Sequence, residues 1–145
     1  MNQTIRVQTE DFDQGEEYRQ LASGTEAGAV VTFVGRVRDF AGENASMWLE
    51  HYAGMTEKVL ADLVAQARQR WPILDVTIIH RIGQLSPGDQ IVFVGVSSAN
   101  RHAAFAACEF LMDFLKTQAP FWKREGDHWV EAKDTDQAAA DAWNP

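Results

Sequence analysis

Two β-branched runs joined by a strong turn signal constrain the fold of this chain more than any other feature. Residues 75–82 and 90–98 are rich in valine and isoleucine, which favour strands. The sequence Ser86-Pro87-Gly88-Asp89 stands between them, and there proline presets φ while glycine accepts a positive φ. The pattern predicts an antiparallel hairpin, and hence a sheet with antiparallel strands.

Two amphipathic helices are expected to pack on that sheet. The first opens at Gly54, has apolar residues three and four positions apart as far as Trp71, and is stopped by Pro72. The second is predicted over residues 103–115. The lone cysteine, Cys108, lies on the apolar stripe of the second helix, where burial raises the pKa of a thiol and leaves it inert.

Shorter elements complete the prediction. Their irregular alternation favours an α+β fold with a largely antiparallel sheet over a doubly wound fold, and 145 residues fit one domain, 1–145. The expected elements are strands at 4–8, 28–37 (mostly buried) and 47–52, a short helix capped by Asp13 and Glu16, a tight hairpin of 121–125 with 128–131 around Gly126-Asp127, and a last helix capped by Asp134 that ends near Trp143.

Composition and motifs exclude several classes of protein. The net charge of −8 argues against a general nucleic-acid or membrane-surface binder, and no apolar run reaches the roughly 18 residues of a membrane span. The acidic N-terminal segment lacks the apolar region of a signal peptide, and one cysteine excludes an internal disulfide. The common nucleotide-binding loops and zinc-ligand spacings are missing. We therefore expect a soluble cytoplasmic domain with no resident metal or cofactor.

Cations are concentrated in two short segments of an acidic chain. Residues 100–124 hold four basic and two acidic residues, a local charge of +2, which leaves −10 for the rest. Arg36 and Arg38 form a second basic pair. This distribution favours a small anionic ligand over a polyanion, and ordinary solvated surface charges are the alternative explanation.

The segment from Lys116 to Glu125, KTQAPFWKRE, carries the strongest functional signal. Lys116 ends the predicted helix, where the helix dipole favours a cation by a few tenths of a kcal/mol, roughly. Lys123 follows a proline and two aromatic residues, and rings that exclude water suit an ammonium group to proton transfer or nucleophilic attack. The same rings also fit a role as core anchors, and spacing alone leaves both interpretations open.

Five blocks of sequence resemble the family of molybdopterin synthase catalytic (large) subunits. They occur in the family's order and extend the similarity from about residue 5 to Trp143. The last block is the most specific, because it joins APFWKRE to a lysine at the end of a helix. The blocks are VVTFVGRVR (30–38), LEHYAGMTEK (49–58), HRIGQLSPGD (80–89), IVFVGV (91–96) and FLKTQAPFWKRE (114–125).

The resemblance implies an α/β hammerhead fold with a smaller antiparallel β subdomain, and an enzyme of molybdenum-cofactor biosynthesis. The reaction would transfer sulfur to cyclic pyranopterin monophosphate and form the dithiolene of molybdopterin. The sulfur would arrive as a thiocarboxylate on the C-terminal Gly-Gly of a small ubiquitin-like carrier subunit. The family assembles as a central homodimer with one carrier at each end, a heterotetramer.

The resemblance also assigns residues to the site. Lys116 and Lys123 match the family's two essential lysines, which act as general acid–base groups or transiently hold an intermediate. Asn100 departs from the family, which commonly has histidine there, and asparagine does not titrate near neutral pH. The matched substrate-contacting positions are Phe33, Arg36, Val37, Arg38, Asn100, Arg101, Met112, Arg124 and Glu125.

Helix geometry adds one inference that is independent of the family. Arg101 and Lys116 lie at the two ends of one predicted helix, and at 1.5 Å per residue they are roughly 22 Å apart. One small pterin cannot touch both within a chain, so a shared site requires Arg101 from a second subunit.

Two other functions are compatible with the same cations. A noncatalytic phosphometabolite-binding or assembly module would use the same basic pocket and would tolerate Lys→Arg changes. An RNA-binding module would use Phe121 and Trp122 beside the cations, but the net charge and the lack of a broad basic stripe disfavour it.

Overall fold

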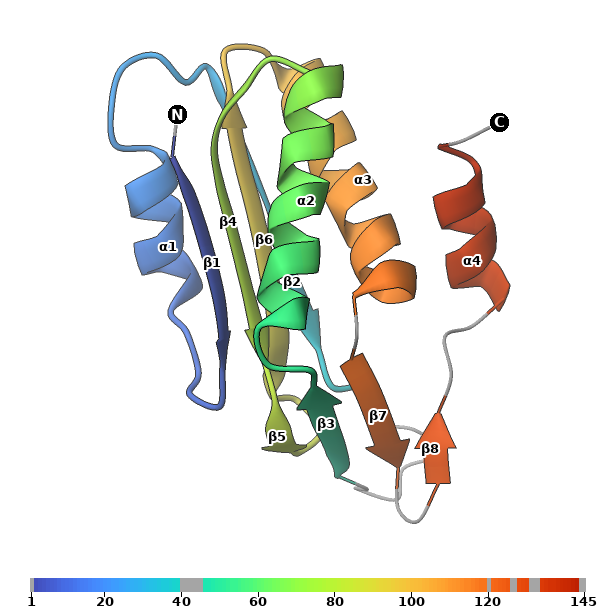
Figure 1. The fold of residues 1–145 in the computed structure, drawn as a ribbon. Helices are drawn as coiled ribbons and strands as arrows, with labels where there is room; N and C mark the ends of the chain where they lie inside the picture. Colours follow the sequence, from blue (N-terminus) through green and yellow to red (C-terminus); the bar gives the residue numbers. More distant parts are fainter. Residues whose placement is uncertain (1, 40–45, 120, 126–127, 131–133, 144–145) are drawn as a thin grey trace.

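The computed structural model describes residues 2–39, 46–119, 121–125, 128–130 and 134–143. Its strands form two four-stranded sheets, which lie one above the other in Figure 1. The helices are α1 (Gln14–Leu21), α2 (Met55–Arg70), α3 (Arg101–Gln118) and α4 (Asp134–Asp141). The strands are β1 (Gln3–Gln8), β2 (Ala29–Arg36), β3 (Met47–His51), β4 (Ile73–Arg81), β5 (Gly83–Leu85), β6 (Gln90–Ser98), β7 (Phe121–Glu125) and β8 (His128–Val130).

The main sheet has the strand order β1-β4-β6-β2 and is largely antiparallel, as predicted. β1 runs parallel to β4, whereas β6 is antiparallel to both of its neighbours. The predicted pairing of β4 with β6 is confirmed, with Ile78 opposite Val94. The Asp89 amide donates to the Ser86 carbonyl at 2.9 Å, and Gly88 has a φ of 91°. The expected turn therefore forms.

A short strand that the sequence analysis missed interrupts this hairpin. After β4 ends, β5 leaves the main sheet and pairs with β3 in the second sheet. Gly83, the first residue of β5, has a φ of 87°, a conformation that costs glycine little. The chain therefore changes sheets at a glycine.

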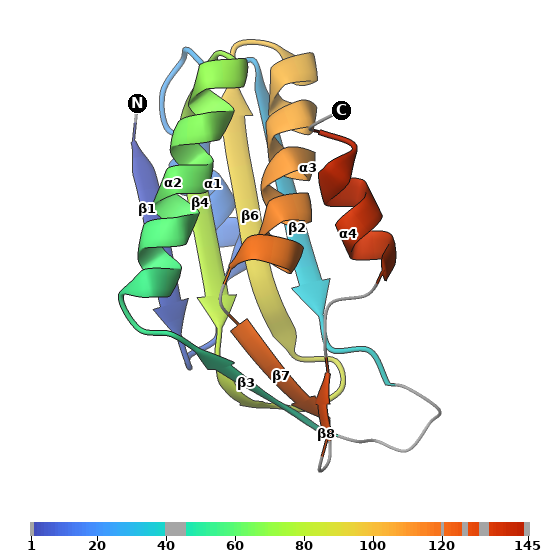
Figure 2. The same cartoon turned by 45° about the vertical axis from the view of Figure 1, so that its right-hand side comes forward.

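The helices cover both faces of the main sheet. α2 and α3 pack on one face and α1 on the other (Figures 1 and 2). Alternate strand residues such as Ile78 and Val94 form the main core with buried helix residues such as Leu63 and Leu111. Within the described residues, no helix combines the length and the apolar character that crossing a bilayer requires.

The second sheet, with the order β5-β3-β7-β8, is antiparallel throughout, in agreement with the expected smaller subdomain. It lies beyond the C-terminal ends of β4 and α3 (Figure 2). Met47 and Leu49 of β3 pack with Leu85 and Val37 in a small core of their own. β7 and β8 pair as predicted, and the turn at 126–127 lies outside the described residues.

Element ends and burial show where the predictions were right and wrong. Asp13 caps α1 as predicted, because its side chain accepts the Glu16 amide at 3.2 Å. β2 is half-buried over most of its length rather than mostly buried, because it is an edge strand. α4 begins at Asp134, whose side chain lies outside the description.

Candidate functional site

A tight corner between α3 and β7 brings the two predicted catalytic lysines to the same end of the molecule. α3 ends at Gln118 and β7 begins at Phe121, whose amide donates to the Ala119 carbonyl at 2.8 Å. Lys116 is exposed in the last turn of α3, whereas Lys123 is half-buried in the middle of β7. Both therefore lie where the helix layer meets the second sheet (Figure 2).

The pairing of β3 with β7 determines which way Lys123 faces. Lys123 is opposite Leu49, and Phe121 is opposite His51. Because strand side chains alternate between faces, Lys123 shares a face with Phe121 and with the buried Leu49. This is the inner face of the second sheet, and the Lys123 side chain is accordingly half-buried.

A buried histidine to which the sequence analysis gave no role lies beside these residues. His80 continues the buried row of Val76 and Ile78 at the end of β4 and is 5% exposed. Its ring stacks on Phe121, with 3.8 Å between centroids and 19° between planes. Its Nδ1 donates to the Arg81 carbonyl at 2.8 Å, since a carbonyl only accepts. The sequence did hold a signal for this residue. Positions 76, 78 and 80 share one strand face, and a histidine at position 80 stands where an apolar residue is expected.

The surroundings of His80 keep its imidazole neutral near pH 7. Burial lowers the pKa of His80 to about 4; the hydrogen bond to the Arg81 carbonyl opposes that shift, and the charges of Lys116 and His51 add to it. Lys116 is thus close enough for its charge to act on His80. The end of α3, which carries Lys116, therefore lies near the stacked rings of His80 and Phe121.

This depressed pKa predicts that the protein loses stability in acid. The unfolded state binds a proton at His80 below its ordinary pKa of 6.5, and the folded state does so only near pH 4. At 1.36 kcal/mol per pKa unit, His80 lowers the free energy of unfolding by up to about 3 kcal/mol as the pH falls through that window. Urea unfolding at pH 7.5, 6 and 5 should show a smaller pH dependence in His80→Phe than in the wild type. Equal slopes would contradict the assignment.

The loop after β2 brings the predicted phosphate-binding arginines to the same end. Val37 is 4% exposed and packs with Leu49, the strand partner of Lys123. Both backbone polar groups of Val37 bond to the turn before β6 at 2.8 Å. Val37 is therefore an anchor whose side chain faces the core, and the exposed Arg36 and Arg38 flank it.

Phe33 and Met112 supply apolar surface near these cations. Phe33 is 41% exposed on the edge strand, and its ring leans over Gly35. A Cβ at Gly35 would lie 3.3 Å from that ring and 2.8 Å from Val92, so glycine leaves the room that Phe33 occupies. Met112 is half-buried on α3, one turn before Lys116.

Asn100 and Arg101 lie at the opposite end of α3 from Lys116 (Figure 2). The structure therefore does not bring them to the lysines within one chain. Asn100 is the N-cap of α3, and its Oδ1 accepts the Ala103 amide at 2.9 Å. With this cap, α3 begins two residues before the predicted range of 103–115. Helix capping therefore explains why an asparagine stands at position 100.

We expect Asn100→Ala to destabilise the protein. Loss of the side-chain cap leaves the Ala103 amide without its acceptor, at a cost of about 1 kcal/mol in the free energy of unfolding. Asn100→Ser, which keeps a capping oxygen, is the matched control and should cost much less. Urea denaturation of both variants measures the difference, and equal losses would show that the cap is not the cause.

The two residues after Lys123 differ in what the structure shows of them. Arg124 is exposed and opposite Trp48, so strand alternation turns it away from the face that carries Lys123. Glu125 ends β7 opposite Met47, and its side chain is not described.

Cys108 does not contribute to this site. It is 5% exposed, and burial, with a smaller effect of Glu109, raises the pKa of its thiol to about 12. The predicted burial of the thiol and the rise in its pKa are therefore confirmed. Among the described side chains, no three His, Cys, Asp or Glu residues are grouped to hold a metal ion.

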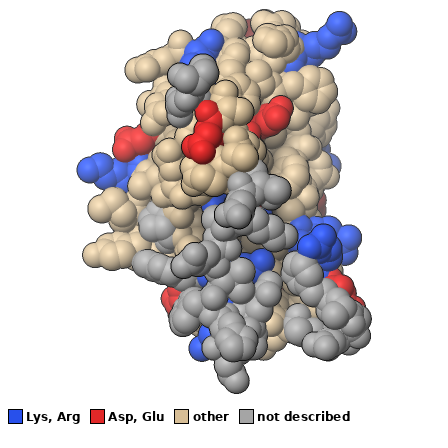
Figure 3. Space-filling model, turned by 90° about the vertical axis from the view of Figure 1, so that its right-hand side faces the viewer, with Lys and Arg blue, Asp and Glu red and all other residues tan. Residues whose placement is uncertain are grey.

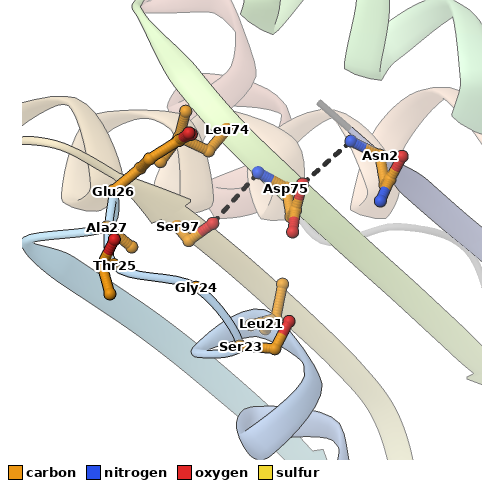
Figure 4. Close-up of a pocket in the computed structure, with 10 residues that line it drawn as sticks. All are labelled: Asn2, Leu21, Ser23, Gly24, Thr25, Glu26, Ala27, Leu74, Asp75 and Ser97. Atoms are coloured by element: carbon orange, nitrogen blue, oxygen red, sulfur yellow. Dashed lines mark hydrogen bonds between the residues drawn. The ribbon is translucent and has the colours of Figure 1, made fainter.

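A hollow of about 380 Å³ opens at the opposite end of the main sheet (Figure 4). The loop after α1, residues 23–27, borders it, together with Asp75 at the start of β4 and Ser97 near the end of β6. The Asp75 amide donates to Ser97 Oγ at 3.0 Å. None of the described side chains predicted for the site lines this hollow, so it is separate from the lysines.

An α+β fold of two sheets that brings Lys116, Lys123 and the loop of Arg36 and Arg38 to one end defines a small protein suited to binding an anion. Figure 3 shows Lys and Arg side chains in the lower half of the view, at the level of the second sheet, and others at its top and left edge. A sequence model of the MoaE protein family matches residues 7–118. The chain therefore belongs to the MoaE family, whose members include molybdopterin synthase catalytic subunits.

Individual relatives agree with this assignment. The molybdopterin synthase catalytic subunit of Escherichia coli (strain K12) is 58% identical over 145 residues, which cover 96% of this chain and 97% of the relative. The molybdopterin biosynthesis MoaE protein of Burkholderia ambifaria has a TM-score of 0.85 at 50% identity, over 98% of each chain. A complex of subunits 1 and 2 of molybdopterin-converting factor from Helicobacter pylori shares the fold, with a TM-score of 0.72 at 20% identity over 91% of this chain and 90% of that one.

Proposed function

We propose that this chain is the catalytic subunit of a cytoplasmic molybdopterin synthase. It transfers sulfur from the thiocarboxylated C-terminus of a small carrier subunit to cyclic pyranopterin monophosphate, and so forms the dithiolene of molybdopterin. The observation that carries the proposal is the α3–β7 corner, which places Lys116 and Lys123 at one end beside the loop of Arg36 and Arg38.

The chemistry requires cations that can also move protons. Each transfer forms one carbon–sulfur bond on the substrate, as that carbon loses its oxygen substituent, and breaks the carbon–sulfur bond of the carrier. Water supplies the oxygen that replaces the sulfur, so the carrier leaves as a carboxylate. Both the thiocarboxylate and the substrate phosphate are anions, which ammonium and guanidinium groups bind through charge-assisted hydrogen bonds. A half-buried lysine such as Lys123 is also placed to donate or accept a proton.

The complete site in this proposal is built from two copies of the chain. Arg101 lies roughly 22 Å along α3 from Lys116, so it reaches a shared substrate only from a second subunit. A homodimer with one carrier bound at each end satisfies this geometry. The Helicobacter pylori relative is described as a complex of two different subunits, and we extend the carrier partnership to this chain.

Arg38 is expected to act in substrate binding. A guanidinium suits a phosphate through bidentate hydrogen bonds, and loss of a hydrogen bond to a charged group costs about ten-fold or more in affinity. Arg38→Ala should therefore raise the KM for the pterin substrate by about ten-fold with a small change in kcat. Arg19→Ala, which removes an exposed arginine from α1, is the control. An unchanged KM in Arg38→Ala would reject the role.

The direct test of the proposed function is reconstitution. Purified protein is incubated with cyclic pyranopterin monophosphate and a thiocarboxylated carrier, and the dithiolene product is assayed. The proposal predicts product only when the carrier holds sulfur, with no product from the carboxylate form. Binding of the pterin without turnover would instead favour a noncatalytic module.

A further inference from the structure

His80 and Phe121 form an aromatic pair that joins the main sheet to the strand carrying Lys123. The two rings are nearly parallel, at 19°, with centroids 3.8 Å apart. His80 is held in place because it is 5% exposed and its Nδ1 donates to the Arg81 carbonyl at 2.8 Å. Its ring plane is thus fixed by a contact within the main sheet.

Phe121 occupies the position from which β7 departs. It is the first residue of β7 and follows the corner closed by its own amide and the Ala119 carbonyl. The ring of His51, the residue opposite Phe121 on β3, is further away, with 6.5 Å between centroids. The flat contact with His80 is therefore closer than the contact with His51, and we infer that it sets the angle at which the strand leaves the corner.

We propose that His80 is a positioning residue for Lys123, which holds Phe121 by stacking and thereby aims the lysine two residues further along the same strand face. This inference rests on the proposed function for its catalytic consequence. A displacement of about 1 Å in a reacting group costs up to about a hundred-fold in rate. A short strand in a small sheet needs a contact from outside that sheet to hold a side chain in place to within about 1 Å.

A histidine suits this role better than a cation would. Burial keeps the imidazole neutral near pH 7, so His80 adds no further positive charge beside Lys116. The neutral ring also stacks on Phe121 as a flat apolar surface, while its Nδ1–H fixes the ring plane through the Arg81 carbonyl. Phenylalanine at position 80 would keep the stack and lose only the hydrogen bond.

The test compares variants with and without a flat ring. His80→Leu and Phe121→Leu keep apolar bulk and remove the stack, whereas His80→Phe keeps it. Reductive methylation followed by mass spectrometry reports the accessibility of each lysine without requiring turnover. Methylation of Lys123 should rise several-fold in both leucine variants and stay near the wild-type rate in His80→Phe, while Lys58 on α2 is unchanged throughout.

Steady-state kinetics supplies the second readout. Each leucine variant should lower kcat by about ten-fold with a KM for the pterin within about two-fold of the wild type. The double leucine variant should lose no more than either single variant, because both remove the same contact. Wild-type methylation of Lys123 in folded His80→Leu, or losses that multiply in the double variant, would overturn the proposal.

If His80→Leu does not fold, Phe121→Leu carries the test alone, since Phe121 is only half-buried. The methylation result stands whether or not the protein turns over. Failure of wild-type reconstitution would therefore count against the proposed function, whereas unchanged Lys123 methylation would count against the positioning role of His80.

Discussion

Replacing either Lys116 or Lys123 by alanine is expected to abolish most dithiolene formation and to leave the fold intact. Lys116 is exposed and Lys123 is half-buried, and neither belongs to a hydrophobic core cluster. Loss of a positioned proton-transfer group costs roughly a hundred-fold to ten-thousand-fold in rate. Turnover with thiocarboxylated carrier, measured beside thermal unfolding, separates the catalytic loss from misfolding.

Two further variants make this prediction specific. Lys58→Ala removes an exposed lysine from α2 and should leave turnover near the wild-type value. Lys116→Arg and Lys123→Arg keep the charge but not the proton-transfer chemistry of an amine, so they should remain strongly impaired. Wild-type turnover in both alanine variants would refute the catalytic role of the lysines.

Mixing two inactive chains is expected to restore activity. In a mixed dimer of Lys116→Ala with Arg101→Ala, one site combines the intact Lys116 of one chain with the intact Arg101 of the other, and the second site carries both changes. Random mixing of the two chains therefore restores about a quarter of the wild-type sites. Activity is measured after the chains are unfolded and refolded together, and mixed dimers are verified by differently tagged subunits.

The control for this experiment uses the two lysines. They lie on one corner of one chain, so each site in a dimer of Lys116→Ala with Lys123→Ala lacks one lysine. That mixture should stay inactive. Absence of recovery in verified Lys116→Ala and Arg101→Ala mixed dimers would contradict the shared site.

Much of the fold could be predicted from local patterns. The β4–β6 hairpin followed from two β-branched runs around one proline–glycine turn, and its register confirms that interpretation. The stop of α3 before Pro120 and the pairing of β7 with β8 were also predicted, so the sequence placed both lysines around one corner. These features depend on interactions between residues that are close in the chain.

The features that were missed depend on contacts between distant segments. The stacking of His80 on Phe121 joins residues 41 positions apart in sequence, and no spacing rule reveals it. Val37 was grouped with the substrate-contacting arginines, but its side chain is buried with β3 and β5, which pair only in the folded sheet. Arg124 is different, because its turn away from the face of Lys123 follows from local strand alternation, which the sequence analysis did not apply to it.

The central claim is that Lys116 and Lys123 contact one substrate. Methylation of each lysine, followed by mass spectrometry while cyclic pyranopterin monophosphate is titrated into the wild-type protein, tests this most directly. We expect Lys116 and Lys123 to become protected together at the same substrate concentration, while Lys58 stays reactive and inorganic phosphate alone protects less. Saturating substrate that leaves Lys116 and Lys123 as reactive as in the free protein would contradict it.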